Sequence, residues 1–207
     1  MLRLLLCTLL AVNAFALDRC ASYGQEVRRA HFAVFGVDYP YQYGVAQLKV
    51  ESNCRDIISN DGYGCEGVAQ IPMSMWAKSL KANGIEEVRT TRNNLRAQAF
   101  IMKQNYNEKY PLWVMYQRYN AGYYVIWEMQ RANATDWQKA YDACKDYYTR
   151  KKQGEKLEHA RGDSKFTLKN GAQYRSNCDI NYEYSQNIFK IGKEFGNVSS
   201  NDKFIYW

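Results

Sequence analysis

Apolar side chains recur at helical spacing along most of this chain, in segments bounded by glycine, proline or asparagine. The first segment runs from Ala21 to Phe35 and ends at Gly36, a residue suited to a left-handed helix end. Pro40 suits the first turn of a second helix. Three positions of that helix fall on one predicted buried face: Val45, Leu48 and Ser52. A chain with this pattern is expected to be mainly helical.

Later segments also show helical spacing of apolar residues, except for one predicted loop. Residues 59 to 67 contain Asn-Asp-Gly and three glycines, which is typical of a loop or short hairpin. The further predicted helices are Pro72 to Gly84, a stripe through Leu95, Ala99, Met102 and Tyr106 that Pro111 ends, a long helix opening at Thr135 or Asp136, and a stripe through Ile180, Tyr184, Ile188, Ile191 and Phe195. Asn170-Gly171 suggests a turn before the last stripe.

Residues 1–16 have the pattern of a secretory signal peptide. Arg3 gives a charged start, an apolar run extends from Leu4 to Val12, and Ala14-Phe15-Ala16 is a small-x-small cleavage site. The mature chain is expected to start at Leu17, in the periplasm or outside the cell. No stretch approaches the ~20 apolar residues that a membrane span needs, so no stable span is expected. A retained N-terminal anchor is the alternative.

Length and charge limit the classes of partner. A chain of 207 residues with 46% hydrophobic residues can bury one main core and a small appendage. Removal of the leader takes away Arg3 and lowers the formal charge from +7 to +6. A mildly basic exported protein is attracted to anionic polymers, such as lipid surfaces or cell-wall glycan with its peptide carboxylates. No nucleic-acid motif is present, and the basic run Arg150-Lys151-Lys152 is interpreted as a solvated helix end.

The cysteines predict disulfides after export. The mature chain holds Cys20, Cys54, Cys65, Cys144 and Cys178, an odd number that leaves at least one outside intrachain disulfides. Spacing does not determine connectivity. The two pairings that we expect are Cys54 with Cys65, which would staple the Gly-rich loop, and Cys144 with Cys178. Both histidines lie far in sequence from any cysteine cluster, so neither a metal site nor a cofactor is expected.

Three segments carry polar groups suited to chemistry. Val50-Glu51-Ser52-Asn53 lies near the middle of the second predicted helix, with Glu51 on the flank of the buried face. The Gly-rich segment Gly64-Cys65-Glu66-Gly67-Val68-Ala69-Gln70-Ile71-Pro72 follows it, and Tyr119-Asn120-Ala121-Gly122 ends a later helix. An acid on an apolar surface, a Gly-rich loop beside it and a Tyr/Asn pair that could close over a sugar favour a glycan-cleaving site.

The order and spacing of these segments resemble the lysozyme-like lytic murein transglycosylases (SLT domain), especially small exported members associated with secretion and pilus systems or with phages. The matching positions include Glu51-Ser52, Gly67 to Ile71 and Tyr119 to Gly122, and also Ser74, Trp76, Leu80, Gly84 and Ile85. The resemblance covers roughly residues 20 to 150. The chain departs from it at Ile71-Pro72, where many members have two residues before the proline and others have asparagine in its place.

The resemblance implies a fold and a reaction. The fold would be a mainly α, lysozyme-like domain at residues 17–152, followed by an extension of unknown role at residues 153–207. The reaction would cleave the MurNAc-GlcNAc β-1,4 bond of peptidoglycan without consuming water. Glu51 would protonate the leaving oxygen and then deprotonate the C6 hydroxyl, which gives a 1,6-anhydro-muramic product. A neutral Glu51 needs a raised pKa, which burial beside Leu48, Val68 and Ala69 would supply.

The same resemblance implies the supporting residues. Gln70, with backbone groups of Val68 and Ala69, would hold the N-acetyl substituent, although a purely structural amide is the alternative. Tyr119 would hydrogen-bond near Glu51 or the N-acetyl group, and Asn120 would fix the closing loop; a buried tyrosine and a helix cap are the alternatives. Ser52 would orient Glu51 by a hydrogen bond, or serve as an ordinary helix serine.

Two other functions stay open on the sequence. A goose-type hydrolytic muramidase would use a second carboxylate to activate water, and the candidates are Asp56, Asp61 and Glu66. A noncatalytic cell-wall-binding or assembly protein would keep the cleft without turnover. In each case the expected partner is the peptidoglycan glycan strand, and the resemblance adds a secretion, pilus or phage-lysis assembly.

Overall fold

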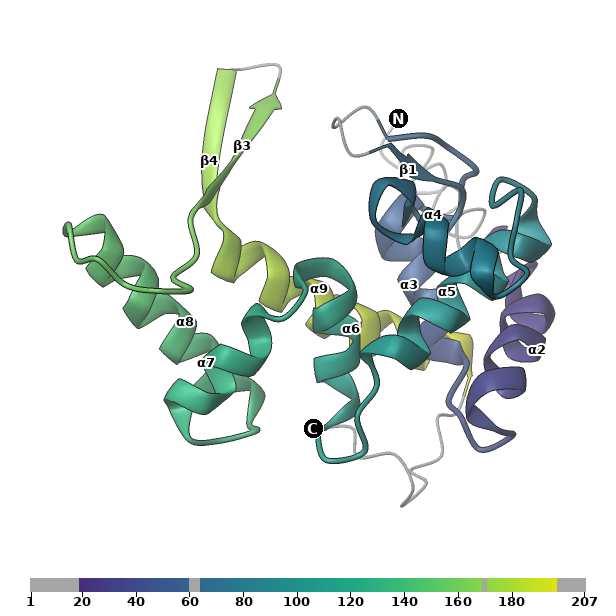
Figure 1. Ribbon diagram of the computed structural model, residues 1–207, viewed down its shortest axis with the longest axis horizontal. Helices are drawn as coiled ribbons and strands as arrows, with labels where there is room; N and C mark the ends of the chain where they lie inside the picture. Colours follow the sequence, from purple (N-terminus) through teal and green to yellow (C-terminus); the bar gives the residue numbers. More distant parts are fainter. Residues whose placement is uncertain (1–18, 60–63, 169–170, 197–207) are drawn as a thin grey trace, which may run out of the picture. The chain divides into compact units, whose positions relative to one another are not determined.

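A computed structural model describes residues 19–59, 64–168 and 171–196 of the chain (Figure 1). Helices dominate these residues, and two short two-stranded sheets accompany them. The mainly α class is therefore confirmed, whereas the predicted signal peptide lies outside the described residues. The chain divides into two compact units: unit 1 contains residues 1–104 and 188–199, and unit 2 contains residues 105–187 and 200–207. The boundary predicted after residue 152 lies inside unit 2.

Unit 1 contains four α-helices, a 3-10 helix, a small sheet and the end of a further helix within the described residues. The elements are α2 (Gly24–Phe35), α3 (Gln42–Ser52), β1 (Cys65–Glu66), β2 (Ile71–Pro72), α4 (Met73–Ala82), α5 (Thr91–Asn105, to Gln104 in this unit), α9 (Asn177–Gly192, from Ile188 in this unit) and the 3-10 helix η1 (Lys193–Phe195). Helix α2 ends at Gly36, whose φ of 91° lies where glycine is favoured. The predicted helix ends at Gly36 and after Pro72 are therefore confirmed to within a residue or two.

Helices α2 and α3 pack in opposite directions. Gly44 of α3 lies so close to α2 that an added Cβ would be 2.9 Å from His31 Cε1. At the other end of the pair, the start of the described chain meets the end of α3 through the disulfide Cys20–Cys54, with a Cα–Cα distance of 5.3 Å. The predicted pairing of Cys54 with Cys65 is wrong, because antiparallel helices bring residue 20 beside residue 54. Cys65 instead opens β1, opposite Pro72.

Buried amides and aromatic rings join the other parts of unit 1 to α3. The Gln98 side-chain amide on α5 donates to Gly44 O at 3.0 Å and to Gln47 Oε1 at 2.9 Å. The end of α9 contacts α3 through Phe189, whose ring centroid lies 4.3 Å from that of Tyr43. Phe189 is not part of the predicted C-terminal stripe; of that stripe, Ile188 is buried in unit 1, whereas Ile191 and Phe195 are half-buried.

Unit 2 consists of three helices, a hairpin and most of α9 within the described residues. The elements are α6 (Leu112–Ala121), α7 (Tyr124–Ala132), α8 (Trp137–Lys152), β3 (Asp163–Leu168), β4 (Gly171–Ser176) and α9 (Asn177–Gly192, to Asn187 in this unit). Asp136 caps α8 by accepting a bond from Lys139 N at 2.9 Å, as the predicted helix start requires. Strands β3 and β4 pair antiparallel with Leu168 opposite Gly171, so the predicted turn involves residues 169–170, which are outside the described residues.

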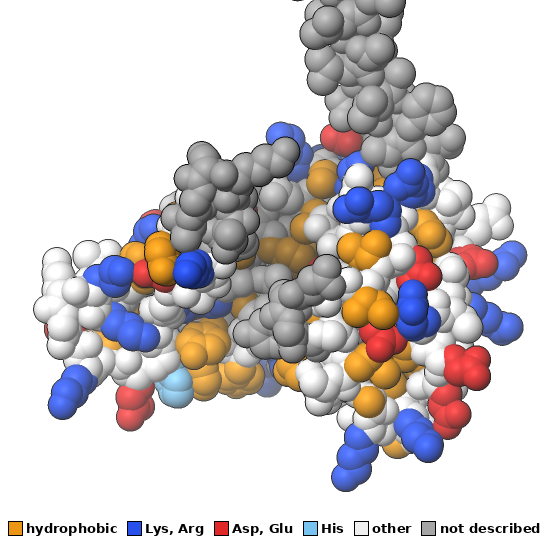
Figure 2. Space-filling view, turned by 90° about the horizontal axis from the view of Figure 1, so that it is seen from above, with side chains coloured by type: hydrophobic (Ala, Val, Ile, Leu, Met, Phe, Trp, Pro, Cys, Tyr) orange, Lys and Arg blue, Asp and Glu red, His pale blue; other side chains and the backbone are white. Residues whose placement is uncertain are grey.

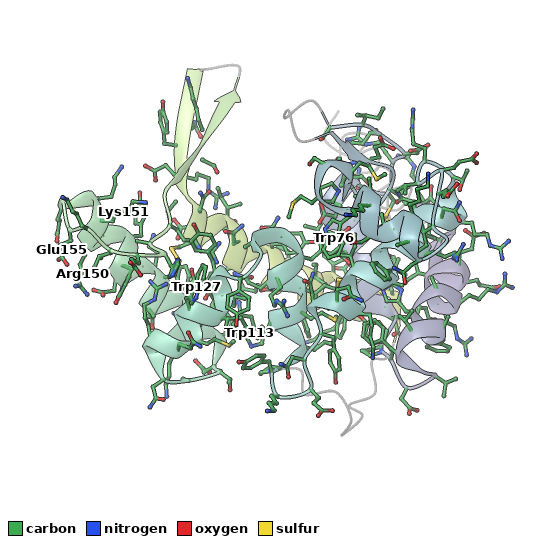
Figure 3. All side chains as sticks on the ribbon, viewed as in Figure 1. Trp76, Trp113, Trp127, Arg150, Lys151 and Glu155 are labelled. Atoms are coloured by element: carbon green, nitrogen blue, oxygen red, sulfur yellow. A yellow bond between two sulfur atoms is a disulfide. The ribbon has the colours of Figure 1, made fainter. Side chains whose placement is uncertain are left out.

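Large rings and a disulfide hold α6, α8 and α9 together in unit 2. Trp113 is fully buried on α6 (Figure 3), and its ring centroid lies 6.1 Å from that of Tyr182 on α9. The predicted disulfide Cys144–Cys178 is confirmed and links α8 to the start of α9. Two disulfides among the described residues are compatible with an exported protein.

Charged side chains are spread over the surface, and Figure 2 presents no dense basic patch on the face that it draws. The predicted solvated end of α8 is confirmed for Lys151 and Lys152, which are exposed, while half-buried Arg150 pairs with Glu155 at 2.7 Å beyond the helix (Figure 3). None of the helices in the described ranges combines the length and the apolar character needed to cross a bilayer.

Candidate functional site

The end of α3 presents the predicted acid. Glu51 is half-buried in the last turn of the helix, and Asn53 ends the helix in a left-handed conformation with φ of 54°. The next residue, Cys54, also has a positive φ and is fixed by the disulfide to Cys20. The backbone that carries Glu51 is therefore restrained, because two positive-φ residues, one of them in a disulfide, follow within three positions.

Ser52 connects this helix end to the Gly-rich loop. Its hydroxyl donates to Val68 O at 2.7 Å, with Leu48 O at 3.3 Å as a more distant acceptor. The same oxygen accepts a bond from Arg55 N at 3.1 Å. The structure thus brings two predicted site residues, Ser52 and Val68, into direct contact. The Ser52 hydroxyl therefore donates its hydrogen bond to the Gly-rich loop, and this bond holds the loop against the helix end that carries Glu51.

The loop itself is a tight turn between β1 and β2, in which Cys65 pairs with Pro72 and Glu66 with Ile71. Gln70 occupies a left-handed conformation with φ of 49° and is nearly buried. Its side-chain amide donates to Ile57 O at 3.0 Å and to Gly67 O at 2.7 Å. The side-chain amide therefore bonds to backbone carbonyls of the loop and of the segment before β1, and the choice between its sugar-binding and structural roles stays a prediction.

Asn94 on α5 is a site residue that the sequence analysis missed. Its Oδ1 accepts from Ala69 N at 2.8 Å, and its Nδ2 donates to Glu66 O at 2.9 Å and to Val88 O at 3.0 Å. An added Cβ on Gly67 would lie 2.1 Å from Asn94 Nδ2. A single buried amide thus fixes both sides of the turn. No local pattern marks Asn94, because its partners lie up to 28 residues away.

The backbone groups predicted to hold a sugar substituent are largely committed within the loop. Val68 and Ala69 are buried, with 1% and 0% of their surface exposed. The Val68 carbonyl accepts from Ser52, and the Ala69 N–H donates to Asn94. These groups are used as the frame of the loop, and their role toward a sugar stays a prediction.

Tyr119 and Asn120 belong to unit 2, at the end of α6. Tyr119 is half-buried, and Asn120 is exposed. Asn120 Oδ1 accepts a hydrogen bond from Asn181 Nδ2 of α9, so a residue of the predicted C-terminal extension holds it. The following Gly122 caps α6 with φ of 62°.

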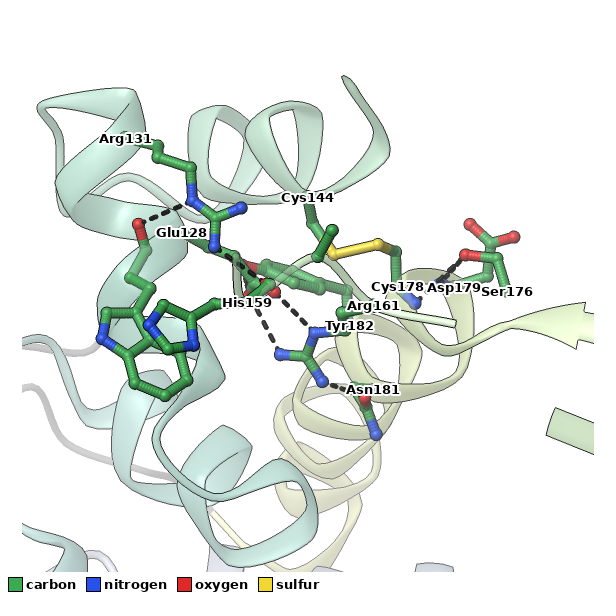
Figure 4. A network of polar contacts seen from close by, with 12 residues as sticks. Glu128, Arg131, Cys144, His159, Arg161, Ser176, Cys178, Asp179, Asn181 and Tyr182 are labelled. Atoms are coloured by element: carbon green, nitrogen blue, oxygen red, sulfur yellow. Dashed lines mark hydrogen bonds and ion pairs between the residues drawn. A yellow bond between two sulfur atoms is a disulfide. The ribbon is translucent and has the colours of Figure 1, made fainter. Parts of the chain in front are cut away.

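Asn181 connects Asn120 to a buried ion pair that sequence reasoning did not find. Arg161 Nη1 donates to Asn181 Oδ1 (Figure 4). The same guanidinium donates from Nε to Glu128 Oε1 at 2.5 Å and from Nη2 to Glu128 Oε2 at 3.0 Å. The hydroxyl of Tyr182 also donates to Glu128, at 2.8 Å. In unit 2, the predicted site residue Asn120 is therefore held by a network of hydrogen bonds. Glu128, whose surface is 0% exposed, lies at the centre of this network.

The other candidate acids differ in exposure. Asp56 is exposed, and Glu66 is half-buried on β1. Asp61 lies outside the described residues. No group of three or more His, Cys, Asp or Glu side chains arranged to hold a metal ion occurs in the part of the chain that the structure describes.

The arrangement in unit 1 offers one chemical resource, a partly shielded carboxyl group on a restrained backbone beside a rigid loop. Glu51 lies in the last turn of α3, at the carbonyl end of the helix. Comparisons with models of known protein families, with curated proteins and with solved structures find no match to this chain.

Proposed function

We propose that this protein is an exported lytic transglycosylase that cleaves the MurNAc-GlcNAc β-1,4 bond of peptidoglycan, in the periplasm or outside the cell. Glu51 donates a proton to the glycosidic oxygen as the bond breaks. The resulting carboxylate accepts the proton of the C6 hydroxyl, whose oxygen attacks the anomeric carbon. The products are a chain ending in GlcNAc and a chain ending in 1,6-anhydro-MurNAc, with no water consumed.

The observation that carries this proposal is the bond from Ser52 to Val68, which couples the helix end bearing Glu51 to a loop anchored by Asn94. Catalysis by one carboxyl group requires that the group be held close to its working geometry, because small displacements are costly in rate. The loop has its turn fixed by Asn94 and by the Gln70 amide. A rigid wall beside a half-buried acid suits protonation of a sugar oxygen.

Digestion of purified murein, followed by mass spectrometry of the fragments, tests the reaction. We expect muropeptides with anhydro ends, each lighter by one water than the hydrolytic product. Hydrolytic fragments would instead assign a goose-type muramidase. Absence of fragments from the native protein would favour a noncatalytic wall-binding role.

Glu51→Gln tests the residue, because the amide keeps the size of the side chain but cannot supply the proton. We expect the rate to fall by about a hundredfold or more, within the range for a lost general acid. The matched controls are Glu66→Gln and Asp56→Asn, which remove the other described candidate acids and are expected to keep anhydro product formation. Full activity in Glu51→Gln would remove this residue from the mechanism.

A further inference from the structure

A groove between α2 and α5 gathers three arginines outside the site described above (α2 and α5 in Figure 1). Its lining residues are Glu26, Arg29, Ala30, Ala33, Arg92, Leu95 and Arg96, and its volume is about 530 Å³. The residues from α2 fall three or four positions apart, as do those from α5, so each helix presents one face to the groove. We call this hollow the α2/α5 groove.

The charge in the groove is not balanced by the protein. In the described ranges the side chains of Arg29, Arg92 and Glu26 take part in no hydrogen bond or ion pair, and that of Arg96 makes a single bond, to Asn93 Oδ1 at 3.3 Å. The lining thus holds three guanidinium groups and one carboxylate. A hollow lined by one sign of charge concentrates ligands of the opposite sign.

The shape and the apolar lining of the groove restrict the ligand further. Leu95 is buried with 1% of its surface exposed, and with half-buried Ala30 and exposed Ala33 it supplies the apolar part of the lining. The volume lies within the range of about 300–1,000 Å³ that is usual for small-ligand sites. A hollow of this kind suits a short, partly apolar chain better than the flat surface of a bilayer.

Glu26, the one acid in the lining of the groove, indicates which class of anionic ligand fits. Arginine binds carboxylates and phosphates in a two-point geometry. Glu26 in the same groove repels a polymer that carries negative charge alone, such as nucleic acid, and offers a partner to an ammonium group. The complementary ligand therefore carries several carboxylates, at least one amine and small apolar side chains.

We propose that the α2/α5 groove binds a short acidic peptide with free carboxylates and an amine. On the substrate proposed above, this ligand is the stem peptide attached to the murein strand, and that assignment rests on the proposed function. The groove would then hold the substrate through its peptide, separately from the acid that acts on the sugar.

Calorimetric titration with a synthetic tetrapeptide made of alanine, glutamate, lysine and alanine tests the binding. The full-length mature protein should bind this peptide and should bind the same peptide with amidated carboxyl groups about tenfold more weakly, as the loss of one charge-assisted contact predicts. Arg92→Glu with Arg96→Glu should weaken binding by about tenfold or more, and the milder Arg92→Ala with Arg96→Ala should act in the same direction. Circular dichroism and thermal unfolding check that each variant is folded.

The matched control is Lys78→Glu with Lys81→Glu, which makes the same charge change on exposed positions of α4 outside the groove. We expect peptide affinity to stay within about twofold in this control. Equal losses in the control and the groove variants would overturn the proposal, because general attraction by net charge would then explain binding. Tighter binding of inorganic phosphate, of a single-stranded oligonucleotide or of anionic lipid vesicles, lost in the same arginine variants, would also overturn it.

The peptide titration uses no glycan and does not require Glu51, so it is independent of the cleavage reaction. Glu51→Gln should bind the peptide as the native protein does. The arginine variants should digest murein with stem peptides more slowly than the native protein, and should digest glycan strands stripped of peptides at the native rate. Peptide binding without any murein cleavage would refute the proposed function and leave the groove as a peptide site. Cleavage by the arginine variants at the native rate on both substrates would refute the stem-peptide assignment.

Discussion

His31 is fully buried on α2, where its ring stacks on Tyr39 with a centroid distance of 5.1 Å. Its Nδ1 lies 2.9 Å from Val27 O and donates to it in the neutral ring. Burial penalises the imidazolium and lowers the pKa of His31 from 6.5 to about 4, and the bond to Val27 opposes this shift. His31 is therefore a neutral core residue of unit 1.

Protonation of His31 should destabilise the protein in acid. The pKa is lower in the folded state than in the unfolded state, so the contribution is complete above pH 6.5 and is lost as the pH falls from 6.5 toward 4. The loss should approach about 3 kcal/mol of unfolding free energy. Urea unfolding at several pH values measures it. His31→Phe, which keeps a ring against Tyr39, should show a weaker dependence over this range.

His159 supplies the matched control because it is exposed, stacked on Trp127 with a centroid distance of 3.5 Å. His159→Phe should retain the pH dependence of the native protein between pH 6.5 and 4. The same dependence in His31→Phe as in the native protein would contradict the assignment to His31.

The turn between β1 and β2 is stabilised as an element by a residue from a helix. The Ala69 N–H is buried and has Asn94 Oδ1 as its acceptor, and the Asn94 amide has two carbonyl acceptors of its own. Local sequence could specify the turn through Gly67, whose φ of 77° favours glycine. Its position against α5 depends on Asn94.

Asn94→Ala should therefore lower both stability and activity. A buried donor left without an acceptor costs about 1–3 kcal/mol of unfolding free energy. Denaturant unfolding measures the stability, and murein digestion measures the effect on the reaction. Asn83→Ala is the control, since the side chain of that exposed asparagine bonds only to Ser79 O at the end of α4 among the described residues, and we expect a change below about 0.5 kcal/mol. Native activity in a folded Asn94→Ala protein would show that the loop needs no anchor for catalysis.

At the scale of the whole molecule, each unit depends on residues far apart in the chain. In unit 1 the end of α9 packs on α3, where an added Cβ on Gly192 would be 2.2 Å from Tyr43 Cδ1. In unit 2 the ion pair of Glu128 with Arg161 links α7 to the segment before β3, and Tyr182 brings α9 to the same carboxylate (Figure 4). The C-terminal residues are thus structural parts of both units.

The buried ion pair yields a stability prediction for unit 2. Arg161→Met leaves the Glu128 carboxylate without its charged partner in a buried place, which should cost about 3–5 kcal/mol. Adding Glu128→Gln to this variant should recover part of the loss, because no uncompensated charge then remains. Thermal and denaturant unfolding followed by circular dichroism measure both variants.

The exposed pair Arg175–Glu183, at 2.6 Å, is the control for the buried pair. Arg175→Met should change the unfolding free energy by less than about 1 kcal/mol. Equal costs at Arg161 and Arg175 would contradict the view that burial makes the difference.

Local chemistry determined the parts of this protein that the sequence could predict. Gly36, Pro111 and Asp136 mark helix ends because glycine, proline and capping side chains act on the backbone within a few residues. The buried faces of the predicted helices were right for Leu48, Leu95 and Met102, since burial follows from helical spacing. The position of Glu51 near the middle of a predicted helix was wrong, because α3 ends at Ser52, where Asn53 and Cys54 adopt positive φ.

Tertiary structure alone decided how these elements were joined. Cys54 pairs with Cys20 and not with the nearer Cys65, because the antiparallel arrangement of α2 and α3 sets the distance. The anchor at Asn94 and the pairing of Glu128 with Arg161 join groups 25 and 33 residues apart, respectively. A polar side chain such as that of Asn94 fixes two segments together only when burial removes water and leaves it one set of hydrogen-bond partners. Burial is a property of the packed unit.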